Sequence, residues 1–450
     1  MKVKVLKFGG TSMATPEARR QAAYRVVSSK DQGFSPLVVV SAIGRKGAPY
    51  ATDTLMGLLK EIDPTVEPDP REMDLMIACG EIFSSVIFAH TLKTLGHSAQ
   101  AFRGGQAGIR TDGVFGNARI LSIHPVSLRR SLMEGHIPVV CGFQGIYVPG
   151  DGSPGGELTT LGRGGSDTTA AALGAALRAH SVEIFTDVDG VKTADPDFVP
   201  QAPTLRKVSY AEVAEIAHLG AKVLHPRAAE IAMKYSIPLW VKNTFGDDEG
   251  TEIVADTEKP DRRFSGVTHT GKLVMFEFSL SEVPVECRRS VEAHVYGVLA
   301  ENGISLFMIN HSASGFGFSV PRSQFPVVSS LLDGFVLPLG DPDRSVAFFQ
   351  LGDQPSPEAR AQARVLGSLG PLASVGIRMM EGCTMVSLIG EEGVRAPGIF
   401  LKILETLDSI QVPVLQTADS DLSLSVLVPE SETARAVRAL HEAFDLEEVR

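Results

Sequence analysis

Hydrophobic residues along the first 245 positions follow two alternating patterns. Five short runs are almost continuously apolar, which is typical of strands buried on both faces of a sheet: residues 3–8, 37–42, 137–142, 182–186 and 237–241. Four longer segments carry apolar residues at helical spacing: residues 16–29, 71–95, 166–180 and 210–219. Strands that alternate with helices predict an α/β fold, a mostly parallel sheet sandwiched by helices.

Apolar periodicity is lost over residues 245–263, which predicts a domain boundary near residue 263. Beyond it, the order strand, helix, strand, strand, helix, strand occurs twice, as in ferredoxin-like βαββαβ units. The clearer second copy has strands at 384–389, 412–417 and 422–428 and helices at 398–409 and 431–444. The first copy has a strand at 272–278, a helix at 287–301 and a strand at 304–310, and its pattern is lost after Gly315. We therefore divide the chain into residues 1–263, 264–380 and 381–450.

The two copies share a helix-to-strand turn, at residues 301–304 and 408–412, which favours a duplicated small domain. The segment 322–352 contains more residues than one ferredoxin-like unit requires. They include a stretch rich in Pro, Gly and Asp at 338–343 and receive no assignment from the sequence.

Charge and composition narrow the classes of function. Lys and Arg total 42 against 53 Asp and Glu, so the formal charge of −11 argues against a nucleic-acid-binding surface. Apolar residues make up 44% and charged residues 21%, as in folded globular proteins. Four scattered cysteines without a Cys-x-x-Cys pair predict a reducing compartment, the cytoplasm. Lysines interrupt the first apolar stretch, and no later one approaches roughly 18 uninterrupted apolar residues, so neither a signal peptide nor a membrane anchor is expected.

A first glycine-rich segment, Lys-Phe-Gly-Gly-Thr-Ser at residues 7–12, directly follows a predicted buried strand. Backbone N–H groups of such a turn can point at phosphate oxygens, and Lys7 adds a full positive charge. The segment matches neither the P-loop spacing nor the dinucleotide fingerprint. Taken alone, an ordinary strand-to-helix turn with a solvated Lys7 is the simpler interpretation.

Two further glycine-rich segments carry candidate chemistry. Gly-Arg-Gly-Gly-Ser-Asp at residues 162–167 places Arg163, suited to a carboxylate, before an Ala-rich helix that Asp167 could equally well cap. Phe-Thr-Asp-Val-Asp-Gly at residues 185–190 leaves a buried strand at its carboxyl end, where open α/β sheets bind ligands, although it could be only a turn.

In this order, the three segments closely resemble the amino acid kinase family, and within it the aspartate kinases. Similar segments include Cys-Gly-Glu at 79–81, Gly-Phe-Gln-Gly at 142–145 and Gly-Ala-Lys-Val-Leu-His-Pro-Arg at 220–227. The resemblance covers essentially residues 1–245, and the second half resembles the paired ACT regulatory domains of the same enzymes. It implies the amino acid kinase fold followed by two ferredoxin-like ACT domains.

The activity implied by this resemblance is transfer of the γ-phosphoryl group of MgATP to the side-chain carboxylate of L-aspartate. The product is 4-phospho-L-aspartate, at the entry to lysine, threonine and methionine biosynthesis. Because the attacking carboxylate is ionised at neutral pH, no general base is required. Phosphoryl transfer depends mainly on positioning and charge neutralisation. ATP and Mg²⁺ are the implied cofactors, and no metal-ligating residues of the protein are predicted.

The resemblance also assigns site residues. Lys7 and Asp167 are the predicted catalytic residues. The aspartate-binding set is Thr52, Glu81, Arg163, Gly164, Gly165 and Ser166. The ATP-binding set is Lys7, Phe8, Gly9, Gly10, Ser41, Ser166, Thr186, Asp187, Lys192 and Lys222. Arg163 takes the α-carboxylate and Glu81 the ammonium, which agrees with the cost of an unpaired carboxylate in a strongly apolar helix. The family often has a basic residue where Asp197 stands here, so the sequence departs from the family's pattern of nucleotide contacts past Pro196.

The ACT-like copies are expected to bind an end-product amino acid after their helix-to-strand turns, at Met308, Ile309, Asn310, Gln416 and Thr417. Exposed edges of their sheets predict at least a homodimer. His225, which precedes Pro226, is interpreted as a helix cap without chemistry. Two alternatives stay open: a related kinase for another acid such as glutamate or acetylglutamate, and a catalytically silent amino-acid sensor.

Overall fold

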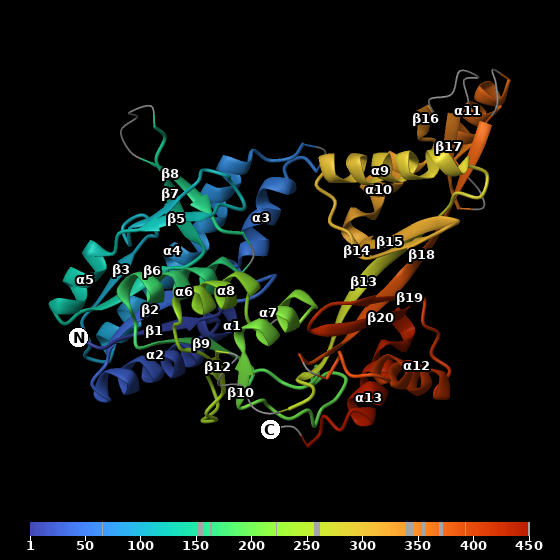
Figure 1. Ribbon diagram of the computed structural model, residues 1–450. Helices are drawn as coiled ribbons and strands as arrows, with labels where there is room; N and C mark the ends of the chain where they lie inside the picture. Colours follow the sequence, from blue (N-terminus) through green and yellow to red (C-terminus); the bar gives the residue numbers. More distant parts are fainter. Residues whose placement is uncertain are drawn as a thin grey trace. The chain divides into compact units, whose positions relative to one another are not determined.

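The computed structural model describes residues 1–64, 66–150, 156–162, 164–221, 223–255, 262–338, 346–352, 356–368, 372–391 and 393–448. The chain forms two compact units, shown in Figure 1. The first consists mainly of Met1–Pro196 and Gln201–Ser265, and the second mainly of Gly266–Leu446. This division lies close to the boundary expected at residue 263.

The central sheet of the first unit has eight strands in the order β10-β12-β11-β9-β1-β2-β6-β3. They are β1 (Val3–Phe8), β2 (Ser35–Val40), β3 (Ala99–Phe102), β6 (Ile137–Cys141), β9 (Ser181–Thr186), β10 (Lys207–Ser209), β11 (Leu239–Asn243) and β12 (Thr251–Val254). All neighbours are parallel except β11 and β12. The predicted mostly parallel sheet is confirmed. The five apolar runs form β1, β2, β6, β9 and β11, and β11 begins two residues later than expected.

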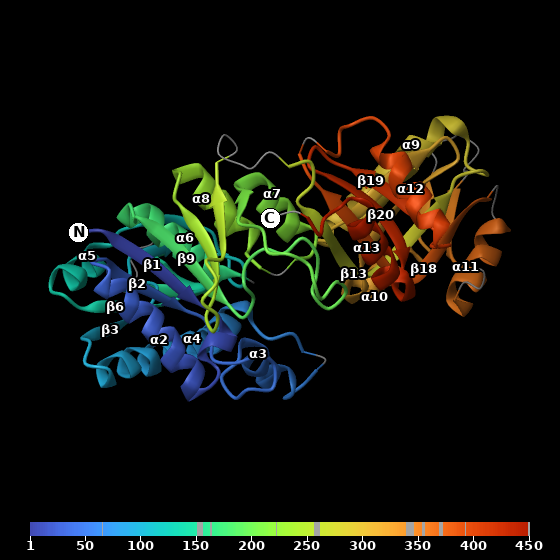
Figure 2. The same ribbon diagram turned by 90° about the horizontal axis from the view of Figure 1, so that it is seen from below.

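Helices cover both faces of this sheet, as Figure 2 shows. They are α1 (Gly10–Met13), α2 (Pro16–Asp31), α3 (Thr52–Lys60), α4 (Pro70–Thr94), α5 (Val126–Met133), α6 (Gly165–Leu177), α7 (Tyr210–His218) and α8 (Pro226–Tyr235). Alternation along β1 sends Leu6 and Phe8 into the core beneath α2 and α4, where the Phe8 ring lies 5.6 Å from Phe88. Lys7 therefore points to the opposite face, toward α6.

A smaller sheet in the first unit was not predicted. Its order is β5-β4-β7-β8, formed by β4 (Ile109–Thr111), β5 (Ile120–Ile123), β7 (Gln144–Tyr147) and β8 (Glu157–Thr160). Strands of three or four residues are too short for a readable hydrophobic period.

Helix α4 has the length and apolar composition that would suffice to cross a membrane, a feature the sequence analysis did not single out. Half of the apolar stretch is buried inside the fold, and core helices meet the same criteria. Its buried face includes the carboxylates Asp74 and Glu81.

The second unit is organised around two long antiparallel strands, β13 (Gly266–Ser279) and β18 (Leu372–Ile389), whose pairing shifts register between Thr270 and Leu273. One half of the pair is flanked by β15 (Gly315–Pro321) and β14 (Phe307–Ser312), the other by β20 (Ser423–Pro429) and β19 (Gln416–Asp419). Each half is thus a four-stranded ferredoxin-like sheet. The last strand of the second copy is the first half of β13, which precedes the first copy in the sequence.

The helices of the second unit include α9 (Val285–Glu301), α10 (Phe325–Leu332), α12 (Ile399–Ser409) and α13 (Thr433–Ala443). The unassigned region 322–352 contains α10, β16 (Val336–Pro338) and β17 (Val346–Leu351), with α11 (Pro357–Gly367) following. Because β17 runs parallel beside β18, these elements widen the first sheet by two strands. Most of the stretch 338–343 lies outside the described residues.

The turn that ends the first helix has the same geometry in both copies, as the sequence indicated. After α9, Gly303 has a φ of +68° and the Ile304 N–H donates to the Leu299 carbonyl at 3.0 Å. After α12, Gln411 has a φ of +57° and the Val412 N–H donates to the Leu407 carbonyl at 2.9 Å. Both are Schellman motifs, in which a left-handed residue ends the helix.

Gly303→Ala should therefore lower the free energy of unfolding of the second unit by about 1 kcal/mol, because alanine is disfavoured in the left-handed conformation. A Cβ at this position would contact no other atom, so no steric clash adds to this cost. Gln411→Gly, at the equivalent position, should act in the opposite direction. Urea unfolding of the full chain measures both. Equal changes of the same sign would contradict the duplicated turn.

Candidate functional site

Loops that follow four adjacent strands meet at one edge of the first unit's large sheet. The Gly9 N–H donates to Phe185 O at 3.3 Å, the Ser41 N–H to Phe8 O at 3.1 Å, and the Gly142 N–H to Val40 O at 3.0 Å. These bonds join the carboxyl ends of β9, β1, β2 and β6. Open α/β sheets bind their ligands at this edge.

Gly10 packs closely against the loop after β2. A Cβ at Gly10 would lie 2.4 Å from Gly44 O and 3.1 Å from Ala42 O, so only glycine fits there. The Gly44 N–H in turn donates to Gly10 O at 3.0 Å. The two-glycine turn predicted from the sequence is therefore held between two loops at the ligand-binding edge.

The predicted catalytic residues form an ion pair. The Lys7 Nζ lies 2.7 Å from the Asp167 Oδ1, and the two side chains are only 11% and 12% exposed. The Asp167 Oδ2 accepts a hydrogen bond from the His225 N–H at 3.2 Å. Asp167 thus holds a nearly buried ammonium beside the Gly9 turn, where a Cβ on Gly9 would lie 3.6 Å from the Lys7 Nζ.

Helix α6 brings its N-terminus to the same place. Its N-cap is Gly164, with a left-handed φ of +70°, and a Cβ there would lie 2.0 Å from the His225 ring. Ser166 is buried against Gly142, where a Cβ would lie 2.6 Å from the serine Oγ. The helix adds partial positive charge at its N-terminus.

Glu81 is the most strongly perturbed carboxylate near this edge. Its Oε1 accepts a hydrogen bond from the Ala42 N–H at 2.9 Å, while its Oε2 is buried with no hydrogen-bond partner among the described residues. Burial raises the pKa of Glu81 to about 8. An ammonium that neutralised the ionised carboxylate would remove this cost. A Cβ on the preceding Gly80 would lie 2.8 Å from Tyr50 O, which places the start of α3, Thr52, next to this turn of α4.

The residues predicted on the nucleotide side lie after β9. Thr186 accepts a hydrogen bond from the Val188 N–H at 3.0 Å, and Asp187 forms an ion pair of 2.6 Å with Arg45. The Lys192 Nζ donates to Ala202 O and to the Thr204 hydroxyl, both at 3.3 Å. In this structure, the Lys192 side chain therefore stabilises the loop between residues 192 and 204. Arg163 and Lys222 lie outside the described residues.

Three residues of this region were not singled out from the sequence. Arg45 lies in the loop after β2, and this position after a strand end is the one sequence feature that could have marked it as a site residue. Asp74 is fully buried on α4 and accepts hydrogen bonds from the Thr160 N–H at 2.8 Å and the Thr160 hydroxyl at 2.6 Å. Arg227 donates to Leu161 O at 3.2 Å. Asp74 and Arg227 therefore hold the end of β8 and the residue after it, and only tertiary contacts reveal this.

His225 caps α8 as predicted, because its Nδ1 accepts a hydrogen bond from the Arg227 N–H at 3.3 Å. Burial lowers the pKa of its imidazole, which favours the neutral ring needed for this contact. Its backbone N–H also holds Asp167, so the cap has a second role.

Two of the predicted effector residues converge in the second unit although 106 positions separate them in the chain (416 − 310 = 106). A Cβ on Gly317 would lie 2.9 Å from the Asn310 Oδ1 and 3.1 Å from the Gln416 Nε2. Asn310 also lines a cleft of about 590 Å³. Met308 is buried, whereas Ile309 and Thr417 are exposed.

The buried carboxyl of Glu81 makes a testable contribution to stability. Because its pKa is raised from 4.5 to about 8, the folded chain retains a proton that the unfolded chain loses within this interval. The free energy of unfolding should therefore fall as the pH rises through it. Glu81→Gln should remove this fall. The free energy of unfolding of the variant, measured by urea titration relative to that of the wild type, should therefore increase from pH 4.5 to about 8.

Glu17→Gln is the surface control. Hydrogen bonding to its own backbone lowers the pKa of Glu17. Its contribution to the free energy of unfolding is therefore lost as the pH falls into the acid range, the opposite direction from Glu81. Parallel stability curves for the wild type and Glu81→Gln would show that Glu81 is not perturbed by burial.

Comparison with known proteins agrees with both units. Residues 2–243 match the family model described as the amino acid kinase family, and residues 386–444 match a model of the ACT domain. Aspartokinase 1 of Bacillus subtilis (strain 168) is 36% identical over 453 residues, which cover 99% of this chain and 100% of that protein. The aspartokinase of Geobacillus stearothermophilus is 34% identical, over 100% of this chain and 98% of that protein.

Solved structures show the same relationship. E. coli aspartokinase III in complex with aspartate and ADP superimposes with a TM-score of 0.71 at 26% identity, covering 98% of this chain and 99% of that one. The complex of the same enzyme with lysine and aspartate gives a TM-score of 0.68 at 25% identity, covering 99% and 100%. The chain therefore belongs to the amino acid kinase family, and within it to the aspartokinases.

Proposed function

We propose that this protein transfers the γ-phosphoryl group of MgATP to the side-chain carboxylate of L-aspartate, giving 4-phospho-L-aspartate and MgADP. The observation that carries the proposal is the Lys7–Asp167 ion pair at the glycine-lined strand ends, with the buried carboxylate of Glu81 on α4. The relatives named aspartokinase, one of them solved with aspartate and ADP, support the same two substrates.

Lys7 is the proposed electrostatic catalyst. The Lys7 ammonium and the Gly10 N–H would neutralise charge on the transferring phosphoryl group, while the Gly9 N–H donates to Phe185 O and holds the turn in place. The aspartate side chain is already ionised and attacks phosphorus as the bond to the leaving ADP oxygen breaks, so no residue has to remove a proton. Asp167, fixed by the His225 N–H, orients Lys7. Mg²⁺ arrives bound to the ATP phosphates as part of the substrate.

Glu81 and Arg163 would fix the two ends of the aspartate backbone. Binding of the substrate ammonium requires the ionised Glu81, so the substrate must draw the pKa of this group back down. Arg163 would hold the α-carboxylate with two hydrogen bonds. Thr52, Gly164, Gly165 and Ser166 complete the proposed aspartate pocket.

The nucleotide would extend from Lys7 toward the residues after β9. Ser41 and Ser166 would contact the phosphate groups, and Thr186 and Asp187 the adenosine. Lys192 and Lys222 are further proposed nucleotide contacts. Arg45, ion-paired with Asp187, lies on the same side.

Two other functions compete with this one. A kinase for another acid would use the same phosphate cradle, and a silent sensor would keep the fold without turnover. Retention of Lys7, Asp167 and Glu81 with an ion pair intact disfavours the silent sensor. Turnover measured with aspartate, glutamate and acetylglutamate in turn separates the two kinases.

The second unit would make the enzyme responsive to an end product of lysine or threonine biosynthesis. Effector binding is proposed at Met308, Ile309, Asn310, Gln416 and Thr417. Edge strands of ferredoxin-like sheets can pair with those of a second copy, so we expect a homodimer in the cytoplasm.

Lys7→Ala should lower kcat with aspartate by about 10² to 10³-fold, the usual cost of removing one preorganised electrostatic contact. A coupled assay for ADP measures it. Lys4→Ala is the matched control, since Lys4 is a similarly buried lysine on the same strand, paired with Glu183 at 3.1 Å. Glu183 keeps Lys242 at 3.4 Å in that variant, so the fold and kcat should change little. Equal kcat values for the two variants would refute the role of Lys7.

Asn310→Ala and Gln416→Ala should weaken inhibition by an end-product amino acid while kcat stays close to that of the wild type. Inhibition curves with L-lysine and L-threonine, singly and together, are the measurement. Asn302→Ala is the control, because the Asn302 side chain donates to its own helix, at Val298 O. Inhibition curves that coincide for all four proteins would exclude these positions as effector contacts.

A further inference from the structure

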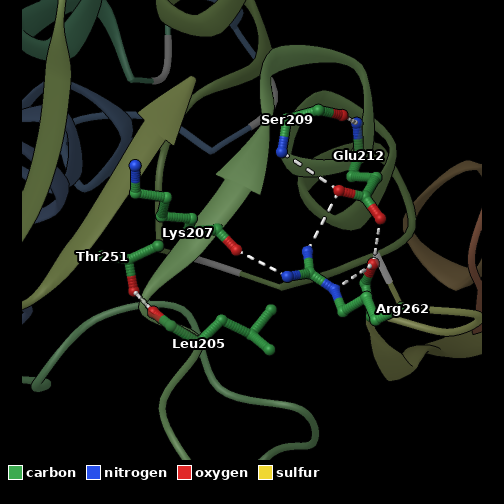
Figure 3. A network of polar contacts seen from close by, with 7 residues as sticks. Leu205, Lys207, Ser209, Glu212, Thr251 and Arg262 are labelled. Atoms are coloured by element: carbon green, nitrogen blue, oxygen red, sulfur yellow. Dashed lines mark hydrogen bonds and ion pairs between the residues drawn. The ribbon is translucent and has the colours of Figure 1, made fainter. Parts of the chain in front are cut away.

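A buried polar cluster near the end of the first unit has no part in the substrate contacts described above. At its centre, the Arg262 Nη2 lies 3.1 Å from the Glu212 Oε2, and the side chains are 8% and 5% exposed. Figure 3 shows the Arg262 guanidinium between the Glu212 carboxylate and the backbone carbonyl of Lys207. A buried ion pair adds little net stability, because desolvation offsets the attraction, but it can specify one arrangement of the chain.

The guanidinium uses three of its N–H groups on three different acceptors. Its Nη1 donates to Lys207 O at 2.6 Å, its Nη2 to Glu212, and its Nε to the Ser265 hydroxyl at 3.3 Å. The Ser265 hydroxyl itself donates to the Glu212 Oε1. Since the second unit begins at Gly266, these bonds attach the segment that leaves the first unit to β10 and to α7.

Glu212 is also part of the start of α7. Its carboxylate accepts from the Ser209 N–H at 3.0 Å, while its own N–H donates to the Ser209 hydroxyl at 3.1 Å, which is a complete capping box. One carboxylate therefore satisfies the helix start and the exit segment together.

The contacts continue from β10 to the turn that follows β9. The Thr251 hydroxyl donates to Leu205 O at 2.6 Å and accepts from the Val191 N–H at 2.9 Å. The Leu205 N–H donates to Val191 O at 2.8 Å. Gly190 packs so closely on Thr251 that a Cβ would lie 2.4 Å from its Oγ1. Lys207, two residues after Leu205, accepts from Arg262, so residues 205–207 link the exit segment to Gly190 and Val191 at the end of the turn.

We infer that Arg262 is a positioning residue for nucleotide binding: through Lys207, Leu205 and Thr251 it fixes Gly190 and Val191, which end the turn that begins at Thr186. A disturbance of the exit segment would then reach this turn, which gives the second unit a route to the nucleotide side. The inference rests on the proposed function only in naming ATP as the ligand of that turn.

Hydrogen exchange of the full chain tests the structural part. Arg262→Lys keeps the charge but cannot reach three acceptors at once. It should speed amide exchange in peptides covering residues 187–195 by about tenfold, through easier local opening, with β1 and β2 unchanged. Thr251→Val should have the same effect on that turn, and the double variant should exceed neither single variant, because both break one chain of contacts.

Arg129→Lys is the control, since Arg129 donates to a single carbonyl, Ala176 O. Faster exchange confined to residues 207–212 and 262–265, or faster exchange throughout the first unit, would overturn the inference. So would strictly additive effects in the double variant.

Calorimetric titration with MgADP tests the functional part. Arg262→Lys should weaken MgADP binding by about fivefold, at the low end of typical coupling between sites, while the KM for aspartate changes little. Wild-type protein that binds MgADP without phosphorylating aspartate would refute the proposed function and leave this inference standing. Faster exchange at 187–195 with unchanged MgADP affinity would refute the inference alone.

Discussion

The nearly buried ion pair between Lys7 and Asp167 is the interaction on which the site depends. A lysine near the end of a central strand is costly unless a carboxylate meets it, and the first turn of α6 supplies that carboxylate. The pair therefore fixes which face of the sheet α6 covers at this point. It also leaves an ammonium, two glycines and a helix N-terminus at the same edge, where an anion is favoured.

Glu81 complements this arrangement with the opposite charge. Its carboxylate lies on α4, on the other side of the loops after β1 and β2, and is destabilised by burial. The site thus holds a stabilised cation at the end of a strand and, on helix α4, a buried carboxylate with one unpaired oxygen among the described residues. A substrate with both an ammonium and carboxylates fits such a pair of environments. Its ammonium would neutralise the Glu81 carboxylate, while the Lys7 ammonium attracts the negative charge at the other end of the site.

The second unit shows how pairing can override chain order. The element order of the second copy was predicted as far as its last helix, and that of the first copy only as far as its second strand. The structure shows that the first half of β13 completes the second copy, although it comes before the first. The two copies consequently share β13 and β18 and form one continuous sheet. Two long strands that serve both halves offer a mechanical link that two separate domains joined by a linker would lack.

Local patterns determined much of this protein. Continuous apolar runs predicted the five central strands, the Gly-Gly pair predicted the strand-to-helix turn after β1, and the paired helix ends predicted the duplication, because each depends on residues close together in the chain. Tertiary structure alone decided that Asp74 holds Thr160, that Asn310 and Gln416 meet at Gly317, and that Arg262 is buried against Glu212. These contacts join residues tens to hundreds of positions apart, and a side chain's burial and partner are set by whatever packs against it, which no local pattern records.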